Sequence, residues 1–430
     1  MSHDIRALHE HVESCARAGD VSGSLPRLDE AIAAEPQRAD LRFLRARVLL
    51  ALQRPAPALA DLDQLLAVDP AADPARFQRA LTLAGLERLG EALEDFLELS
   101  RRRPEKVESW ANAGMILLRM ERYAEAIPHL RRAAQMSPAN MQLRRSLANA
   151  LSGNGALAEA MPLFESVVRA TPRDPAALTD YAMALMSAGR PRDAHAQLLA
   201  ALRVDPTDQT ALAGLYLSGN ELGMGELVDQ LMDYPRLLSP IPRPEGIALD
   251  REALREAVLA HPGLVWQPAG RSTWQGRQSP MLDLSPGSPF ADFGAMVRHV
   301  VDERLAAVRA DPALRGHPWT RTLPTRWRLQ AWCTVLESGG RQTPHIHPAG
   351  RLSGVYYLDT GDAPGPGAGT LTFGHAPDSV AMSAAPRQFA LPPREDWICC
   401  FPSYFFHHTE PFQGTTRPRI SLAFDVMPAG

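Results

Sequence analysis

The chain of 430 residues has few of the features that mark secreted, membrane or nucleic-acid-binding proteins. Its four cysteines are too few and too unevenly placed for a disulfide framework or a four-thiolate zinc site, so we expect buried thiols. With 45 basic and 49 acidic side chains there is no basic excess, which argues against nucleic-acid or membrane-surface binding. No apolar run approaches the roughly 18 residues that span a bilayer, and the first ten residues lack the apolar core of a signal peptide. We therefore expect a cytoplasmic protein.

Proline, in contrast, is abundant: its 38 residues are nearly twice the usual share of about 5%. Six prolines recur at one constant interval, without a slip: Pro36, Pro70, Pro104, Pro138, Pro172 and Pro206. A proline ends a helix because it has no amide hydrogen and restricts the residue before it. The spacing therefore predicts six helical repeat units over residues 5–208.

Two further positions repeat with the same period. Small residues recur at Ser24, Ala58, Ala92, Ala126, Ala160 and Ala194. Four places later, on the same helix face, stand large apolar residues: Leu28, Leu62, Phe96, Leu130, Phe164 and Leu198. A small side chain at the crossing point lets two antiparallel helices pack closely. The segment resembles tetratricopeptide repeats, which implies an all-α solenoid.

After Pro206 the pattern decays, with Gly219, Gly223 and Gly225 expected to break the helix surface. We expect residues 209–232 to form divergent capping helices, because a stacked array must hide its last apolar face. Stacked helix pairs form a concave groove, for which we expect a peptide or protein partner. A dimerisation arm or a plain scaffold stays open as an alternative, and the oligomeric state is not determined by the sequence.

The second half of the chain has a different texture. A proline-rich linker is expected over residues 233–250, followed by a second domain over residues 245–430. An amphipathic helix is predicted at residues 290–309. Short strands are predicted at 328–337, 352–359, 369–374, 388–392, 396–402 and 419–427, which favours an antiparallel jelly roll. The predicted fold class is thus α+β and multidomain.

Histidines in two segments of this domain suggest a metal site. His345 and His347 are two residues apart, so on an extended chain both imidazoles point to the same side. His407 follows a predicted strand, and continued alternation from Phe401 would turn it inward and turn His408 away. Three neutral nitrogen ligands suit iron, zinc or copper. The alternative for His345 and His347 is that they are surface or core histidines that bind no metal.

Arg419 and Ser421 begin the last predicted strand, two residues apart and therefore on one face. A planar guanidinium matches a carboxylate better than an ammonium does, and a serine hydroxyl adds a donor. A structural ion pair or a solvated strand end is the alternative role for Arg419.

The order of these motifs, HxHP, LSGVYYL, FPSYFFH and RISLAF, resembles the double-stranded β-helix (jelly-roll) core of Fe(II)- and 2-oxoglutarate-dependent oxygenases. It is similar in particular to a bacterial and phage branch of that family, over about the last 100 residues. The resemblance implies Fe(II), 2-oxoglutarate and O2, with His345, His347 and His407 at the metal. It further implies Arg419, Ser421 and Tyr357 on 2-oxoglutarate, and no catalytic residue beyond the metal ligands. With a tetratricopeptide arm, it implies hydroxylation of a peptide or protein side chain.

One departure leaves alternatives open. His347 stands where the family has an acidic ligand, so it either binds the metal, lies behind it with water in its place, or belongs to an inactive site. The alternative functions are a three-histidine, cupin-like dioxygenase that needs no 2-oxoglutarate, and a non-catalytic adaptor with a relic barrel.

Overall fold

The computed structural model describes residues 4–362, 367–380 and 382–429. The chain divides into two compact units, residues 1–154 and 155–430. No helix in the described ranges is long and apolar enough to cross a membrane. The predicted domain limits, at residues 208, 232 and 250, stay a prediction.

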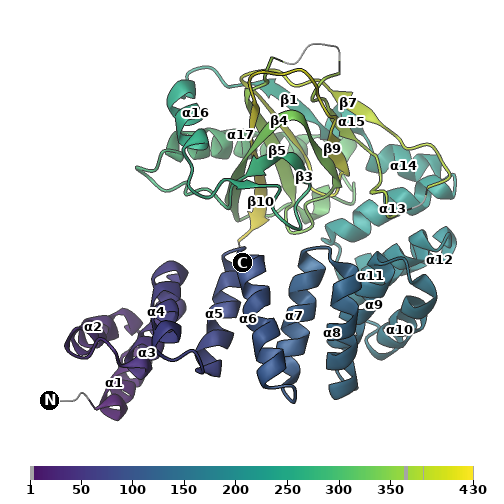
Figure 1. The fold of residues 1–430 in the computed structure, drawn as a ribbon. Coiled ribbons are helices and arrows are strands. Elements are labelled where there is room, and N and C mark those ends of the chain that lie inside the picture. The colour runs from purple at the N-terminus through teal and green to yellow at the C-terminus, as the bar shows by residue number, and fades with distance from the viewer. Residues whose placement is uncertain (1–3, 363–366, 381, 430) are drawn as a thin grey trace. The chain divides into compact units, whose positions relative to one another are not determined.

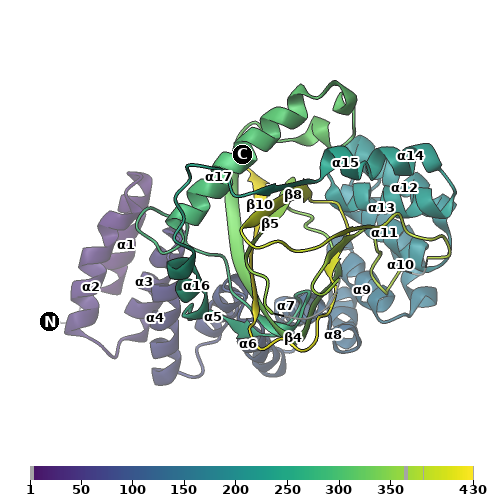
Figure 2. The same ribbon diagram turned by 90° about the horizontal axis from the view of Figure 1, so that it is seen from above.

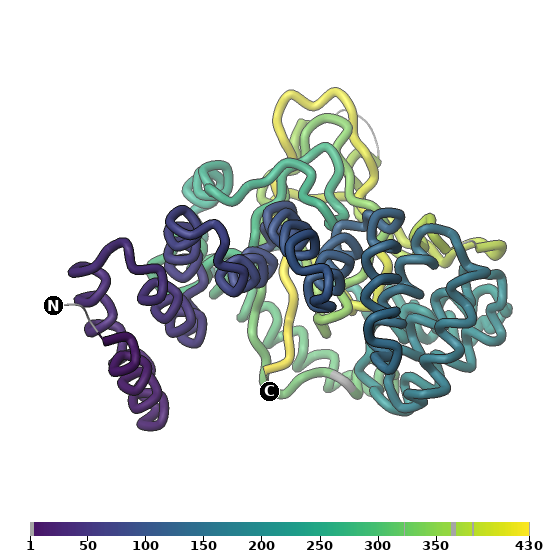
Figure 3. The backbone as a smooth tube through the Cα atoms, turned by 60° about the horizontal axis from the view of Figure 1, so that its bottom comes forward, coloured from purple at the N-terminus to yellow at the C-terminus, as the bar shows by residue number. Residues whose placement is uncertain are grey.

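The first unit is a stack of antiparallel helix pairs (Figures 1 and 3). Its elements are α1 (Ile5–Arg17), η1 (Val21–Ser24), α2 (Leu25–Ala34), α3 (Ala39–Ala51), α4 (Pro55–Val68), α5 (Asp73–Gly85), α6 (Leu89–Arg102), α7 (Val107–Arg119), α8 (Tyr123–Met136) and α9 (Met141–Gly153). Helices α3, α5, α7 and α9 begin at successive steps of the proline interval, and so do α4, α6 and α8. The repeat length predicted from the prolines is confirmed.

The second unit begins with six helices, of which α10 to α14 keep the same interval. They are α10 (Leu157–Ala170), α11 (Pro175–Ser187), α12 (Pro191–Val204), α13 (Gln209–Glu221), α14 (Gly225–Leu231) and α15 (Tyr234–Leu237). The expected break at Gly219 is wrong, because α13 runs through it. A Cβ there would lie 3.2 Å from Leu227 Cδ2, so the missing side chain lets α14 approach α13 closely.

The predicted contact positions form the core of the helix pairs. All six small residues are 0% exposed, and the six large apolar residues four places later are 0 or 1% exposed. At one crossing, a Cβ on Gly114 would lie 2.5 Å from Leu130 Cγ. The repeating pattern therefore records side-chain packing between the two helices of each pair.

Two buried carboxylates recur in the first unit at the same interval. Asp61 and Asp95 are each 2% exposed. Arg45 donates to both oxygens of Asp61 at 2.8 and 2.6 Å, and Arg79 donates to both oxygens of Asp95 at 2.7 Å. These side-chain hydrogen bonds raise the pKa of Arg79. Each buried acid thus has a bidentate arginine partner.

The rest of the second unit is a curled antiparallel sheet with helices beside it (Figure 2). Its elements are β1 (Ser239–Pro242), α16 (Arg251–Leu259), β2 (Val265–Trp266), β3 (Thr273–Gln278), α17 (Ala291–Ala310), η2 (Pro312–Leu314), η3 (Thr320–Thr322), β4 (Trp327–His345), β5 (Leu352–Asp359), β6 (Leu371–Phe373), β7 (Phe389–Leu391), β8 (Trp397–Pro402), β9 (His407–Thr409) and β10 (Arg419–Pro428). The predicted strands and the helix at 290–309 are confirmed, and with them the jelly-roll-like, α+β fold class.

Strand β4 joins the two halves of this sheet, whose order is β1-β8-β5-β10-β4-β9-β6-β7. Residues 327–336 of β4 pair with β10, and its far end, from Gln342 to His345, pairs with β9. One long bent strand therefore carries the sheet from the half that holds β5 and β10 to the half that holds β6 and β9.

Helix α17 packs on the outer face of β5, where Phe293 contacts Tyr356 with ring centroids 6.0 Å apart. Tyr357, the next residue, therefore points to the inner face.

Of the cysteines, Cys333, Cys399 and Cys400 are buried as expected, whereas Cys15 is partly exposed.

Candidate metal centre

Three histidines from separate positions along the chain converge inside the curled sheet. His345 is the last residue of β4 and is the register partner of His407, the first residue of β9. His347 follows β4 by two residues. One ligand atom from each lies within 4.8 Å of the other two. The structure thus brings together all three histidines that the sequence predicts at the metal.

The hydrogen bonds of these rings decide which nitrogen carries the proton. His345 Nδ1 lies 2.7 Å from the Thr343 carbonyl oxygen, and His407 Nδ1 lies 2.9 Å from that of Phe405. Because a carbonyl oxygen only accepts, both Nδ1 atoms must carry the proton and donate it. His347 Nδ1 lies 2.6 Å from a carboxylate oxygen of Asp425, with the same consequence. Each ring therefore keeps the lone pair on Nε2, as a metal ligand requires.

Two of the histidines, His345 and His407, are held in the neutral form. Desolvation lowers the pKa of His345 to about 3, and the neighbouring His347 adds to the effect. Desolvation also lowers the pKa of His407 well below its ordinary value. A metal cation would therefore not have to displace protons from these two rings near neutral pH.

Aromatic side chains wall the cluster. Phe401 and Phe373 lie against His407, with ring centroids 4.8 and 6.1 Å away, and Trp332 lies 5.3 Å from His347. Such a wall limits access of water and lowers the local dielectric constant, which strengthens electrostatic interactions at the site.

His408 and His375 are not part of the cluster. His408 Nε2 bonds to Glu410 Oε1 at 2.9 Å, and its ring lies 5.6 Å from that of His375. The choice of His407 over His408 agrees with this geometry, but the alternation that suggested it is wrong. Residues 403–406 form a turn between β8 and β9, in which Phe405 N donates to the Pro402 carbonyl.

Arg419 is buried on the inner face of β10, without an acidic partner in the described ranges. The residue is 2% exposed, and its Nη1 donates to the Gly369 carbonyl at 2.6 Å. Its guanidinium lies 5.1 Å from the ring centroid of Tyr357. Neither Arg419 Nε nor the Tyr357 hydroxyl has a hydrogen-bond partner in the described ranges. Burial lowers the pKa of Arg419, but a guanidinium stays charged, so its surroundings favour an anion.

Gly369 allows the close approach to Arg419. Its φ is +64°, and a Cβ there would lie 3.0 Å from Arg419 Nη1. Both the backbone conformation and the space favour glycine at this position.

Ser421 faces two neighbouring strands at once. It is the register partner of Tyr357 on β5 and of Thr334 on β4, so these three side chains share one face. The hydroxyl of Thr334 is buried without a partner, as is that of Thr370, the residue after Gly369. Sequence reasoning missed both threonines, because their positions beside Ser421 and Arg419 depend on strand register and loop path, which a single sequence does not specify.

The inner face of β10 connects the arginine to the histidines. Arg419, Ser421 and Asp425 occupy alternate positions and so lie on one face. Asp425 contacts His347 at the far end of this face, about 20 Å from Arg419 measured between Cα atoms. The guanidinium shortens this gap, because it lies over Tyr357, the partner of Ser421.

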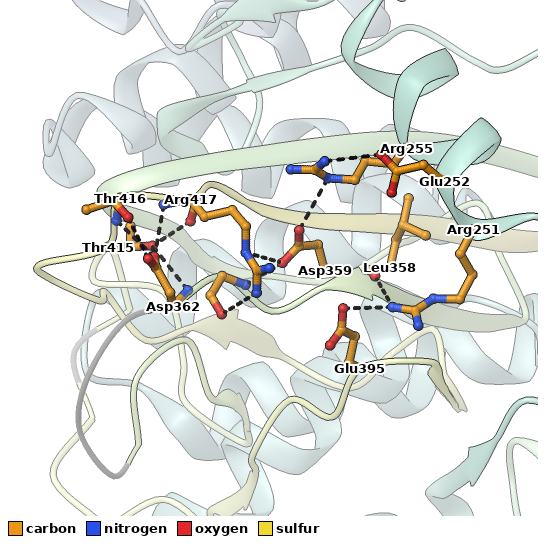
Figure 4. A network of polar contacts seen from close by, with 11 residues as sticks. Arg251, Glu252, Arg255, Leu358, Asp359, Asp362, Glu395, Thr415, Thr416 and Arg417 are labelled. Atoms are coloured by element: carbon orange, nitrogen blue, oxygen red, sulfur yellow. Dashed lines mark hydrogen bonds and ion pairs between the residues drawn. The ribbon is translucent and has the colours of Figure 1, made fainter.

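Arg417, the other arginine near the start of β10, has a different environment (Figure 4). Its Nε lies 3.3 Å from Asp359 Oδ1, and its backbone amide donates to Asp362 at 2.9 Å. The Arg417 side chain is 47% exposed. Arg417 is thus a surface arginine with carboxylate partners, and Arg419 alone of the two faces the inner pocket.

Comparisons with known families agree with the two kinds of structure in the chain. Residues 330–425 match the model of the family described as "Putative 2OG-Fe(II) oxygenase". That range runs from β4 to β10 and holds all six predicted site residues. Residues 33–232 match the model described as "Coatomer epsilon subunit". No curated protein matches the chain.

Solved structures similar to the chain include two that are described as tetratricopeptide repeat (TPR) proteins. One from Parabacteroides merdae is 18% identical, with a TM-score of 0.44, and the match covers 53% of this chain and 88% of that one. YrrB, described as having an unusual peptide-binding site, is 23% identical with a TM-score of 0.39, covering 43% and 95%. Pseudomonas aeruginosa pilF is 18% identical with a TM-score of 0.40, covering 48% and 94%. These scores carry no functional information.

Proposed function

We propose that the chain is an Fe(II)- and 2-oxoglutarate-dependent oxygenase that hydroxylates a peptide or protein side chain. The proposed residues are His345, His347 and His407 at the metal and Arg419, Ser421 and Tyr357 on 2-oxoglutarate. The observation that carries the proposal is Arg419, a buried cation without a carboxylate partner in the described ranges. It lies on the strand face that leads to a cluster of three histidine Nε2 atoms.

The histidine set fits iron. Three neutral nitrogen ligands on one side of a divalent cation leave coordination positions open for small molecules. Fe(II) bound there supplies the activation of dioxygen. The role of the chain is to hold the three lone pairs in place through the Nδ1 hydrogen bonds and to keep water out with Phe401, Phe373 and Trp332.

The arginine pocket fits the far carboxylate of 2-oxoglutarate. A guanidinium can bind a carboxylate through two parallel N–H donors, and the Arg419 Nε–H is free to donate. The Tyr357 hydroxyl and the Ser421 side chain project from the same face. Bound in this way, the dicarboxylate supplies the negative charge that the buried arginine lacks.

A peptide or protein substrate is supported by the last helix pair of the solenoid. In α13, Tyr216 donates to the Gly374 carbonyl at 2.6 Å, and Glu221 accepts from the backbone amides of Ser383 and Ala384. Gly374 directly follows Phe373, which lies against His407. These bonds hold α13, most of whose residues are buried, beside the loop that borders the metal centre, so a polypeptide bound on the neighbouring helices would be presented close to that loop.

Succinate formation tests the proposal. Purified full-length protein is incubated with Fe(II), ascorbate and 2-oxoglutarate, and the Arg419→Ala and Arg417→Ala variants are compared. We expect 2-oxoglutarate-dependent succinate from the wild type, none above background from Arg419→Ala, and wild-type levels from Arg417→Ala. Equal succinate from both variants would contradict the role of Arg419.

A three-histidine dioxygenase that needs no 2-oxoglutarate is the second candidate, favoured by the absence of a carboxylate among the clustered ligands in the described ranges. Oxygen consumption separates the two functions. Uptake that does not change when 2-oxoglutarate is omitted would favour the second candidate and leave Arg419 with a structural role.

A further inference from the structure

His347 differs from the other two clustered histidines in what holds its Nδ1. His345 and His407 donate to neutral backbone carbonyls, whereas His347 donates to the carboxylate of Asp425 at 2.6 Å. A charged acceptor forms a stronger hydrogen bond than a neutral carbonyl does, and its negative charge also interacts with a cation on the other side of the ring. His347 is therefore expected to be a more basic metal ligand than His345 and His407.

Asp425 has no other ionic partner in the described part of the chain. It is 9% exposed, lies on the inner face of β10, and accepts a hydrogen bond from the Ser353 hydroxyl at 2.7 Å. Ser353 also bonds to the Ser403 hydroxyl at 2.8 Å. The one ionisable side chain that Asp425 contacts there is His347. An isolated buried carboxylate is costly, so something must compensate its charge.

The backbone fixes His347 against Asp425. The His347 amide donates to the Ser403 carbonyl at 3.0 Å, and the Gly350 amide donates to the His347 carbonyl at 3.1 Å. A Cβ on Gly350 would lie 2.7 Å from Ser403 Oγ, so the turn packs tightly on this network. The backbone of His347 is thus fixed beside the hydrogen-bonded side chains of Ser353, Ser403 and Asp425.

We propose that Asp425 is a positioning residue of the metal centre, which supplies through His347 the negative charge that three neutral ligands lack. The inference rests on the proposed metal centre. A divalent cation held by three imidazoles keeps its full +2 charge in a site walled by aromatic rings, where charge is expensive. The carboxylate behind His347 offsets part of that charge and fixes Nε2 on the cation, while leaving the coordination positions open.

Glu410 provides the matched control, because it also bonds a histidine. Its Oε1 accepts from His408 Nε2 at 2.9 Å, but the Glu410 side chain is 44% exposed and His408 lies outside the cluster. If any acid that bonds a histidine strengthened metal binding, loss of Asp425 and loss of Glu410 would lower the metal affinity equally. The proposal assigns an effect on metal binding to Asp425 alone.

Titration of the metal-free full-length protein with Co(II), followed by its visible absorption, tests the proposal. We expect Asp425→Asn to weaken Co(II) binding about 10- to 100-fold, the usual cost of losing such a partner, and Glu410→Gln to change it less than about twofold. Asp425→Ser, which is smaller and leaves room for water, should show the same loss and replaces Asp425→Asn if that variant does not fold. Affinities of folded Asp425 variants within twofold of the wild type would overturn the proposal.

Moving the carboxylate from position 425 to position 347 distinguishes a residue that supplies charge from one that makes only a structural contact. His347→Asp alone places two carboxylates side by side, whose repulsion disfavours folding or ionisation. In the double variant His347→Asp/Asp425→Asn one carboxylate remains, now at the ligand position, and Co(II) affinity should rise above that of His347→Asp. Equal or lower affinity of the double variant would contradict a charge-supplying role.

The outcomes also separate this inference from the proposed function. If the wild type binds Co(II) and forms 2-oxoglutarate-dependent succinate but Asp425→Asn binds Co(II) equally well, only the Asp425 inference fails. If the wild type binds Co(II), loses affinity in Asp425→Asn and forms no succinate, the metal centre and Asp425 stand and the oxygenase proposal fails. If the wild type binds no Co(II), both fail.

Discussion

Two arginines show how differently the helical repeats and the curled sheet treat buried charge. In the repeats, Arg45 reaches both oxygens of the buried Asp61, at 2.8 and 2.6 Å. In the sheet, Arg419 is itself buried, bonds one backbone carbonyl and has no carboxylate partner in the described ranges. Arg45 compensates the charge of a buried carboxylate of the fold, whereas Arg419 leaves a positive charge available to a ligand.

The difference indicates which polar groups serve the fold and which serve a ligand. The Arg45–Asp61 pair recurs one repeat later as Arg79–Asp95, as a structural contact in a repeat should. Nothing in the described part of the sheet repeats the environment of Arg419, and the hydroxyls of Tyr357 and Thr334 near it are also without partners. Several unsatisfied groups on one face are costly to keep unless a ligand satisfies them.

The largest predicted effect is on co-substrate use. Arg419→Met removes the charge but keeps most of the volume, and loss of a buried carboxylate partner costs about 3–5 kcal/mol, or roughly 100-fold to several thousand-fold in kcat/KM for 2-oxoglutarate. The melting temperature should not fall, because the substitution removes an uncompensated buried charge. Steady-state kinetics and thermal melts check both, with Arg417→Met as the control. If Arg419→Met lowers the melting temperature and leaves kcat/KM unchanged, Arg419 stabilises the fold and does not bind the co-substrate.

The second prediction concerns ligand-linked stability. With Fe(II) bound and oxygen excluded, 2-oxoglutarate at about 100 times its Kd should stabilise the wild type by about 2.7 kcal/mol. The same addition should leave Arg419→Met unchanged, since its pocket no longer binds the far carboxylate. Thermal melts with and without 2-oxoglutarate measure the effect. Equal stabilisation of both proteins would place the carboxylate elsewhere.

The third prediction concerns the repeats. Arg45→Met should destabilise the fold by about 1–3 kcal/mol, because Asp61 then loses its bidentate donor while Arg42 remains 3.5 Å away. The double variant Arg45→Met/Asp61→Leu should recover most of that loss, since it leaves no unpaired buried charge. Urea denaturation followed by circular dichroism measures both. Succinate formation should not change, in contrast to Arg419→Met.

The smallest predicted effect tests the unpartnered threonine. Thr334→Val keeps the shape of the side chain and removes a hydroxyl that bonds nothing in the described ranges. If the hydroxyl contacts the co-substrate, its loss should raise KM for 2-oxoglutarate about two- to tenfold, the value of one hydrogen bond. Thr82→Val is the control in the repeats, because the Thr82 hydroxyl bonds a backbone carbonyl of its own helix. An unchanged KM for Thr334→Val would remove Thr334 from the pocket.

The period of the repeats and their packing positions could be predicted from the sequence, because the same packing requirement recurs in every unit and each recurrence tests the others. The strands of the sheet were also predictable, since alternation and turn residues mark them locally. One wrong expectation, that alternation continues through residues 403–406, followed from applying the strand period where the chain turns.

The site was predictable only where a motif is local. His345 and His347 are two residues apart, and Arg419 and Ser421 likewise, so spacing alone grouped each pair. Asp425 lies 78 residues from His347, and nothing in the sequence between them indicates that β10 returns beside the turn that follows β4. The register of non-neighbouring strands sets such contacts, and a single sequence does not specify it.

Anaerobic binding of 2-oxoglutarate to the Fe(II)-loaded full-length protein, measured by calorimetry, tests the central claim most directly. The wild type should bind one equivalent, only when Fe(II) is present, and Arg419→Met should bind at least 100-fold more weakly while still binding Fe(II). Binding of equal strength in Arg419→Met, or none in Fe(II)-loaded wild type, would contradict the assignment of the buried arginine and the three histidines to one site.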